Sequence, residues 1–256
     1  MSKTMRRPGE FVWREVTCRD GEAAREFYGA LFGWSFQKGV FPDMPYSLII
    51  GPSGPMGGMM EVGADAPMPP SWTAYLSVDS VDETAAGATA AGGQVMHPPT
   101  DIPGVGRFAI AADPTGAVLG VLTQANGDGP RGEQPPVGAF CWETISSTDV
   151  EKERAFYKSV IGWREVGGSA GMVVFASGEV QVCDLEPTEP GMPSFWMSHV
   201  VIEDLDASRA KMESLGGRVL APRVDIPNVG AICIFADREG AVISMFQPGA
   251  AAPSAN

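Results

Sequence analysis

Few side chains in this chain of 256 residues are placed to move a proton. Glu15 lies in the strand-like run FVWREVTC, and His199 lies in the run FWMSHVVI. A buried carboxylate costs free energy unless it is paired or used, so Glu15 is a candidate general base. His199 is a candidate acid or base near neutral pH. Two structural alternatives stay open: an ion pair between Glu15 and Arg107, and a core histidine bonded to the backbone at 199.

Other reactive side chains do not form a known catalytic pattern. The sequence contains no nucleophile elbow, P-loop, dinucleotide fingerprint or HExxH motif. The four cysteines form no CxxC pair, so we expect buried free thiols rather than metal ligands or disulfides. The remaining histidine, His97, precedes PPTDI and is expected in an exposed loop.

The charge and hydropathy of the chain limit its partners. A formal net charge of −13 at pH 7 disfavours nucleic acid, whose phosphates the chain would repel. No apolar run approaches the ~18 residues that a membrane span requires. The N-terminal residues MSKTMRRPGE lack the apolar core of a secretion signal. We therefore expect a cytoplasmic protein with neither a nucleic-acid nor a membrane partner.

Two phrases occur twice in the same order along the chain. EFYGALFGW at 26–34 matches AFYKSVIGW at 155–163. DIPGVGRFAIAADPTGAV at 101–118 aligns without a gap to DIPNVGAICIFADREGAV at 225–242. Two long matches in one order indicate a duplicated domain.

A Gly/Pro-rich polar stretch, QANGDGPRGEQPPVG, separates the two copies and is typical of a linker. The predicted divisions are domain 1 at 9–123, a linker at 124–137, domain 2 at 138–248, and a disordered tail at 249–256.

Each domain divides into two smaller units of one strand, one helix and three strands. In the first, Asp20 is the predicted helix cap, and Ala24, Phe27 and Leu31 share one predicted helix face. Gly33 ends that helix. The same order recurs four times, which predicts an α+β fold. We expect four βαβββ units in two tandem domains with curved mixed sheets and outer helices.

The arrangement resembles the vicinal oxygen chelate superfamily, which includes glyoxalase I, extradiol dioxygenases, and fosfomycin and bleomycin resistance proteins. The resemblance rests on the two FY…GW helices, on VDSVDE and EDLDAS, and on the terminal DPTGAVLGV and DREGAVISM. It covers nearly the whole chain and is strongest to two-domain actinobacterial glyoxalase-like proteins. Metal-dependent members hold one divalent ion in a cup between paired units, with ligands from the first and last strand of each unit.

The resemblance assigns these ligand positions in this sequence, and few of them carry a metal donor. The first-strand positions, usually histidine, hold Trp13, Thr73, Trp142 and Met197. The last strands of the second units, usually glutamate, hold Gly120 and Ser244. The last strands of the first units offer Glu61 and Asp184. Because a divalent cation needs three or four converging N or O donors, we predict no metal and no cofactor.

A cup without its ion would be lined by aromatic, methionine and hydroxyl side chains, which suits an apolar, planar organic molecule. Trp13 and Trp142 would either stack on that ligand or plug the cup. Gly120 would leave room where relatives place a carboxylate. The predicted ligand-binding residues are Trp13, Thr73, Tyr75, Gly120, Trp142, Thr144, Met197 and Ser244.

Three functions remain open at this point. The first is metal-free binding of a small aromatic or polycyclic metabolite, in antibiotic resistance or as an accessory of secondary metabolism. The second is a cofactor-free tailoring enzyme that uses Glu15 or His199 to move a proton. The third is a metal-dependent glyoxalase or dioxygenase with unrecognised ligands. Single-domain relatives close their cup by dimerising, so a fused pair is expected to work as a monomer or a homodimer.

Overall fold

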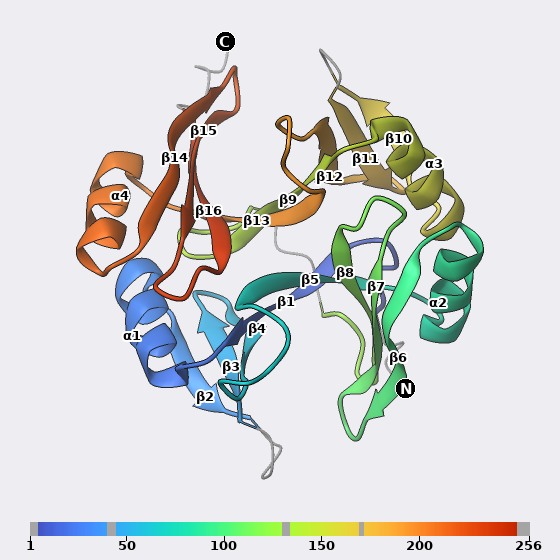
Figure 1. Cartoon of the computed structure of the whole chain (residues 1–256), viewed down its shortest axis with the longest axis horizontal. Coiled ribbons are helices and arrows are strands. Elements are labelled where there is room, and N and C mark those ends of the chain that lie inside the picture. Colours follow the sequence, from blue (N-terminus) through green and yellow to red (C-terminus); the bar gives the residue numbers. More distant parts are fainter. Residues whose placement is uncertain (1–4, 40–44, 130–133, 169–171, 250–256) are drawn as a thin grey trace. The chain divides into compact units, whose positions relative to one another are not determined.

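The computed structural model describes residues 5–39, 45–129, 134–168 and 172–249 (Figure 1). The predicted tail lies almost entirely outside these residues, as does part of the linker. The first two repeats contain β1 (Phe11–Cys18), α1 (Gly21–Phe32), β2 (Ser35–Lys38), β3 (Tyr46–Gly51), β4 (Gly54–Glu61), β5 (Ser71–Ser77), α2 (Val81–Ala90), β6 (Gln94–Ile102), β7 (Gly106–Ala112) and β8 (Val118–Gln124). The last two repeats contain β9 (Phe140–Ser147), α3 (Val150–Val160), β10 (Arg164–Gly167), β11 (Val173–Ser177), β12 (Val180–Pro187), β13 (Phe195–Val201), α4 (Leu205–Ser214), β14 (Arg218–Ile226), β15 (Gly230–Ala236) and β16 (Val242–Pro248).

The strands form two eight-stranded mixed sheets with the same topology. Their orders are β2-β3-β4-β1-β5-β8-β7-β6 and β10-β11-β12-β9-β13-β16-β15-β14. Parallel pairs such as β5 with β8 occur beside antiparallel pairs such as β7 with β8. The predicted α+β class with two tandem domains of βαβββ units is confirmed.

The chain packs into two compact units that differ from the sequence repeats. The first unit comprises Met1–Arg14, Thr73–Gly132 and Trp142–Met197, and it contains α2 and α3. The second comprises Glu15–Trp72, Glu133–Cys141 and Ser198–Asn256, and it contains α1 and α4. The domain limits at 9–123 and 138–248 stay a proposal drawn from the repeat.

Helix α1 begins and ends at the residues that the local sequence predicts. The Asp20 side chain accepts hydrogen bonds from the backbone N–H groups of Glu22 and Ala23 at 3.1 and 2.9 Å. Gly33 ends the helix in the left-handed conformation, at φ 75°, which glycine adopts without a steric penalty. The expected inner face, which includes Phe27, is buried. These contacts confirm the helix and both of its ends.

In each unit, a hydrogen bond joins the FY motif of one repeat to the aspartate-containing turn of another repeat. In the second unit, the Tyr28 hydroxyl donates to Asp237 at 2.7 Å. In the first, the Tyr157 hydroxyl donates to Asp113 at 2.8 Å. The other carboxylate oxygen of each aspartate accepts three backbone N–H groups of its own turn. The tyrosine of the FY motif in one repeat is therefore hydrogen-bonded to the aspartate of the D-x-x-G-A-V turn in another repeat.

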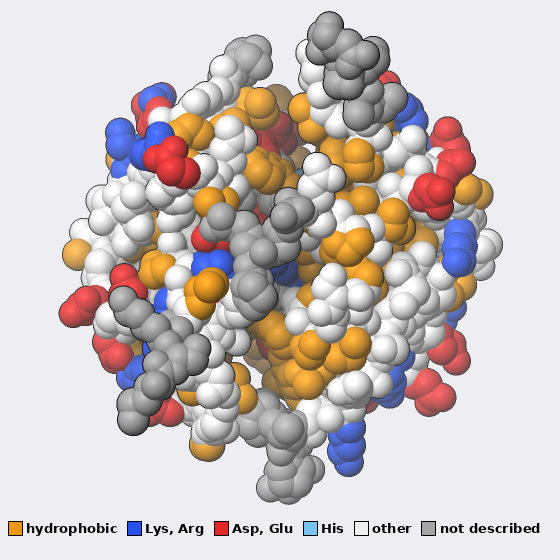
Figure 2. All heavy atoms as spheres, turned by 180° about the vertical axis from the view of Figure 1, so that it is seen from behind, with side chains coloured by type: hydrophobic (Ala, Val, Ile, Leu, Met, Phe, Trp, Pro, Cys, Tyr) orange, Lys and Arg blue, Asp and Glu red, His pale blue; other side chains and the backbone are white. Residues whose placement is uncertain are grey.

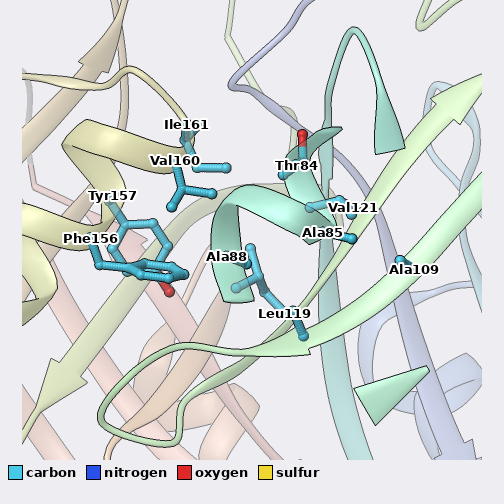
Figure 3. Close-up of a pocket in the computed structure, with 11 residues that line it drawn as sticks. Thr84, Ala85, Ala88, Ala109, Leu119, Val121, Phe156, Tyr157, Val160 and Ile161 are labelled. Carbon is cyan, nitrogen blue, oxygen red and sulfur yellow. The ribbon is translucent and has the colours of Figure 1, made fainter. Parts of the chain in front are cut away.

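A small apolar cavity lies between α2 and α3 in the first unit (Figure 3). Its volume of about 10 Å³ gives room for one water-sized molecule at most. Ala85 and Ala88 of α2 line one side, and Phe156 and Val160 of α3 line the other. The helix contact is therefore packed loosely enough to accept a methyl group.

Replacing Gly87 in α2 with alanine is expected to raise the free energy of unfolding by about 0.5–1 kcal/mol. The added Cβ would meet only Val160 Cγ1, at an ordinary 4.0 Å. Gly93→Ala is the matched control, because its Cβ would lie 2.7 Å from the Ala112 carbonyl oxygen and should destabilise the fold. Urea unfolding of the two variants measures both effects. A less stable Gly87→Ala protein would contradict this packing.

Candidate functional site

Strands β9 and β12 of the first unit carry the most polar of the candidate surfaces. Ile145 and Leu185 point into the core and are fully buried. Because side chains alternate along a strand, Trp142, Thr144 and Asp184 lie on the opposite face. We call this side the open face of β9 and β12. Thr144 and Asp184 stand directly opposite each other in the parallel ladder.

A hydrogen-bonded triad of Trp142, Thr144 and Asp184 occupies this open face. The indole Nε1 of Trp142 donates to Asp184 Oδ1. The Thr144 hydroxyl donates to the same oxygen at 2.9 Å. The structure therefore brings the predicted residues Trp142 and Thr144 together around a carboxylate at one of the expected ligand positions.

The two carboxyl groups of β12 on this face are poorly solvated. Burial raises the pKa of Asp184, although the hydrogen bonds from Trp142 and Thr144 oppose that shift. Burial also raises the pKa of Glu186, and the negative charge of Asp184 adds to the effect. Such an arrangement can accept a hydrogen bond, pair with a cation or transfer a proton.

The first unit has a second open face, on β5, β8, β7 and β6. One row of paired residues runs across it, from Tyr75 through Gly120 and Ile110 to His97. A Cβ at Gly120 would clash with the Tyr75 ring, so that ring fills the space above the glycine. The expectation that Gly120 leaves room for a ligand is wrong. Tyr75 and Gly120 do lie together, as a packed pair.

His97 does not lie in an exposed loop as expected. It belongs to β6, is partly buried, and stacks on Phe108 with ring centroids 4.9 Å apart. The Pro98–Pro99 pair does not end the strand, because β6 is the edge strand of its sheet and proline is tolerated there. His97 and Phe108 add aromatic surface to this open face.

In the second unit, His199 and Ser244 face each other in the parallel pair of β13 and β16. His199 is 5% exposed, and burial lowers its pKa to about 4. The imidazole is therefore neutral at pH 7, which favours the core alternative over an acid or base at that pH. Ser244 is fully buried.

The surrounding strands of the second unit expose large apolar side chains. Leu220 and Val224 of β14 are each 43% exposed, and Val242 of β16 is 36% exposed. Ile234 pairs with Ser244 in the ladder and is only partly buried. This face is consequently more apolar than the open face of β9 and β12. Figure 2 shows hydrophobic side chains in several groups on one side of the molecule, with many charged side chains toward the edge of the view.

The remaining predicted site residues stay a prediction. Trp13 and Thr73 of the first unit are partly buried, and Met197 is buried. Glu15 is partly buried in the second unit. Arg107, proposed as its partner, is instead bound by Asp82 and Asp101 at 2.8 and 2.9 Å. The predicted ion pair between Glu15 and Arg107 is therefore wrong.

The sequence comparison of the repeats offered Glu61 and Asp184 as equivalent positions, but the structure does not place them at equivalent positions. The Val62 N–H donates to the Cys18 carbonyl, and the Thr188 N–H donates to the equivalent carbonyl of Ser147, both at 2.8 Å. This register places Gly58 at the position of Asp184. The side chain of Tyr46 fills the space above Gly58, because a Cβ there would clash with it. The Glu61 carboxylate lies instead against Gly21 in the first turn of α1.

The side chains at the expected ligand positions do not fit a divalent cation. Indole, methionine and glycine supply no donor of the required kind, and Asp184 is the one carboxylate at these positions. Nowhere in the described ranges do three His, Cys, Asp or Glu side chains converge in a way that could hold a metal ion. No described helix is long and apolar enough to cross a membrane.

Family comparison agrees with this architecture. The model of the Glyoxalase/Bleomycin resistance protein/Dioxygenase superfamily matches residues 10–121 and 142–245. The chain belongs to this superfamily. It is 34% identical over 252 residues to the putative glyoxylase CFP32 of Mycobacterium tuberculosis, covering 94% of this chain and 96% of that protein. It is 26% identical over 276 residues to the anthracycline biosynthesis protein DauV of Streptomyces sp. strain C5, covering 97% and 96%.

Solved structures support the same fold at low sequence identity. The Mn(II)-bound glyoxalase of Novosphingobium aromaticivorans superposes with a TM-score of 0.66 at 16% identity, covering 94% of this chain and 82% of that one. The 2,3-dioxygenase LapB of Pseudomonas sp. KL28 gives a TM-score of 0.63 at 13% identity, covering 99% and 97%. At such identities the likeness concerns the fold alone.

Proposed function

We propose that this protein binds a planar aromatic or polycyclic metabolite without a divalent metal, as a resistance-type binder or an accessory of secondary metabolism. The observation that carries the proposal is the hydrogen bond from Trp142 to Asp184. At this pair of ligand positions, the carboxylate is bonded to an indole instead of standing beside a histidine. The indole offers a wide stacking surface whose edge is fixed by the carboxylate.

Further support comes from the open faces and from the relatives. Tyr75, His97 and Phe108 in the first unit form an aromatic surface on one face of β5, β8, β7 and β6. Sites for small organic ligands are mostly apolar with few polar groups, which matches these faces. DauV, a relative over nearly its whole length, is named for anthracycline biosynthesis. Anthracyclines are planar polycyclic compounds, in keeping with the proposed ligand class.

A cofactor-free tailoring enzyme is the second candidate, and one observation favours it. Asp184 is nine-tenths buried, and burial raises its pKa, a direction that favours proton transfer by this carboxyl group. An enzyme of this kind would lose product formation in Asp184→Asn while it still binds the aromatic compound. A binder would release the compound unchanged in both forms of the protein.

Replacing Trp142 with alanine is expected to weaken binding of acridine, a neutral planar probe at pH 8, roughly tenfold. Loss of a stacked ring removes about 0.5–1.5 kcal/mol beyond the loss of buried area. Trp142→Phe keeps a ring and should retain most of the affinity. Isothermal titration of the full chain measures all three proteins, and circular dichroism confirms their fold.

Trp13→Ala provides the matched control, because Trp13 occupies the same position in the first copy. Binding lost in Trp13→Ala and kept in Trp142→Ala would contradict the assignment to β9 and β12. Unchanged affinity in both variants would contradict stacking on either indole.

A further inference from the structure

Two carboxylates on the open face of β9 and β12 have no cationic partner in the part of the chain that the structure describes. Asp184 is 9% exposed, and the hydrogen bonds from Trp142 and Thr144 both go to its Oδ1. The backbone N–H of Asp184 itself also interacts with the carboxyl group. Its Oδ2 accepts no hydrogen bond from another described residue. Glu186, two residues along the same strand, accepts one long hydrogen bond of 3.3 Å from Ser146. Among the described residues, no Lys or Arg nitrogen lies within 4.0 Å of either carboxylate.

The missing countercharge is costly, because a desolvated carboxylate is stable only when it is paired or well hydrogen-bonded. Burial raises the pKa of both groups, in agreement with their poor solvation. The same unit contains a buried carboxylate that does have a cationic partner. Glu143 on the opposite face of β9 is fully buried and binds Arg14 Nε at 2.8 Å.

The fold itself does not require a carboxylate at position 184. The equivalent position of the first repeat is Gly58, and the last strands of the second and fourth repeats carry Gly120 and Ser244. These three repeats form the same strands without a charge at that place. Asp184 is therefore a feature of this site rather than of the βαβββ unit.

We propose that Asp184 and Glu186 bind a protonated amine carried by the aromatic ligand, with the amine against Asp184 Oδ2 and the rings against Trp142. This inference rests on the proposed function and adds the charge of the ligand to it. A cation beside two carboxylates and an indole gains ion pairing and cation–π attraction in a partly desolvated site. The net charge of −13 attracts such a ligand at long range.

Paired titrations with acridine and 9-aminoacridine test this inference. The two probes share one ring system, but at pH 8 acridine is neutral and 9-aminoacridine is a cation. The wild-type chain is expected to bind the cation at least tenfold more tightly at 50 mM salt. Asp184→Asn and Glu186→Gln should each reduce that preference at least threefold, and high salt should reduce it as well. Two variants keep the test valid if one of them folds poorly.

Glu179→Gln is the control for bulk charge. It removes one negative charge from the same hairpin, at a side chain that is 99% exposed, and should leave the preference unchanged. Equal binding of the two probes, or a preference that survives both site variants, would overturn the inference while aromatic binding itself stood. If neither probe bound, the proposed function and this inference would both fail.

Discussion

Replacing Glu143 with alanine is expected to lower the free energy of unfolding by about 3–5 kcal/mol. Glu143 is fully buried in the first unit, and its Oε1 lies 2.8 Å from Nε of Arg14, whose side chain is 13% exposed. Arg14 and Glu143 occupy equivalent positions in the two copies of the first strand. The two copies therefore carry opposite charges at this position. Removing the carboxylate leaves the guanidinium desolvated beside Phe11, whose carbonyl oxygen accepts from Arg14 Nη1 at 3.3 Å.

A double variant separates loss of the pair from loss of packing. Arg14→Met with Glu143→Leu removes both charges and keeps the volume, so it should be at least 2 kcal/mol more stable than Glu143→Ala. Urea unfolding at pH 7 measures the single and double variants. A Glu143→Ala protein within about 0.5 kcal/mol of wild type would show that the ion pair does not stabilise this unit.

The second large effect concerns Glu153, whose replacement by glutamine should stabilise the protein at alkaline pH. Glu153 in α3 is fully buried. Its Oε1 accepts from Thr115 and, at 3.3 Å, from Ser147, while Oε2 has no hydrogen-bond partner among the described residues. Burial, together with the negative charge of Asp113, raises the pKa of Glu153 to about 8.

The sign of this effect follows from proton binding in the folded and unfolded states. Between pH 4.5 and 8 the unfolded chain has released the Glu153 proton and the folded chain keeps it, so stability falls as pH rises. The slope approaches about 1.4 kcal/mol per pH unit for one proton. His199 has the opposite sign: its pKa is lowered to about 4, so stability falls as pH drops from 6.5 toward 4. Between about pH 4.5 and 6.5 the two slopes oppose each other, so a net loss of stability from these two groups is expected above about pH 6.5.

Thermal unfolding of Glu153→Gln from pH 5 to pH 9 checks this prediction. The variant should resemble wild type at pH 5 and melt at a higher temperature at pH 9. Glu151→Gln, on the same helix but with a largely exposed carboxylate, should leave the pH profile unchanged. Parallel profiles for wild type and Glu153→Gln would mean that Glu153 already ionises in the folded state below pH 5.

Local features of the fold could be predicted because their causes lie close together in the sequence. The Asp20 cap and the Gly33 stop depend on backbone groups only a few residues away. The four βαβββ units follow from repeated phrases and from strand and helix periodicities. The binding between Tyr157 and Asp113 was not predicted, because these residues lie 44 positions apart.

The candidate site was predicted less well, for reasons of strand register. A slip of one residue moves a side chain to the other face of a sheet, and register shifts interrupt both β3–β4 and β11–β12. Glu61 was for this reason aligned with Asp184, although Gly58 holds that position. The buried environment of Glu153 could not be predicted from the sequence around it, because its hydrogen-bond partner Thr115 lies 38 residues away.

The metal dependence of binding tests the central claim most directly. Purified full-length protein would be treated with EDTA, checked for residual divalent metal by mass spectrometry, and titrated with acridine in the absence and presence of Mn²⁺. Our account predicts a saturable titration of the metal-free protein, with an affinity that Mn²⁺ leaves unchanged. Acridine binding that vanishes with EDTA and returns with stoichiometric Mn²⁺ would contradict it and would favour a metal-dependent member of the superfamily.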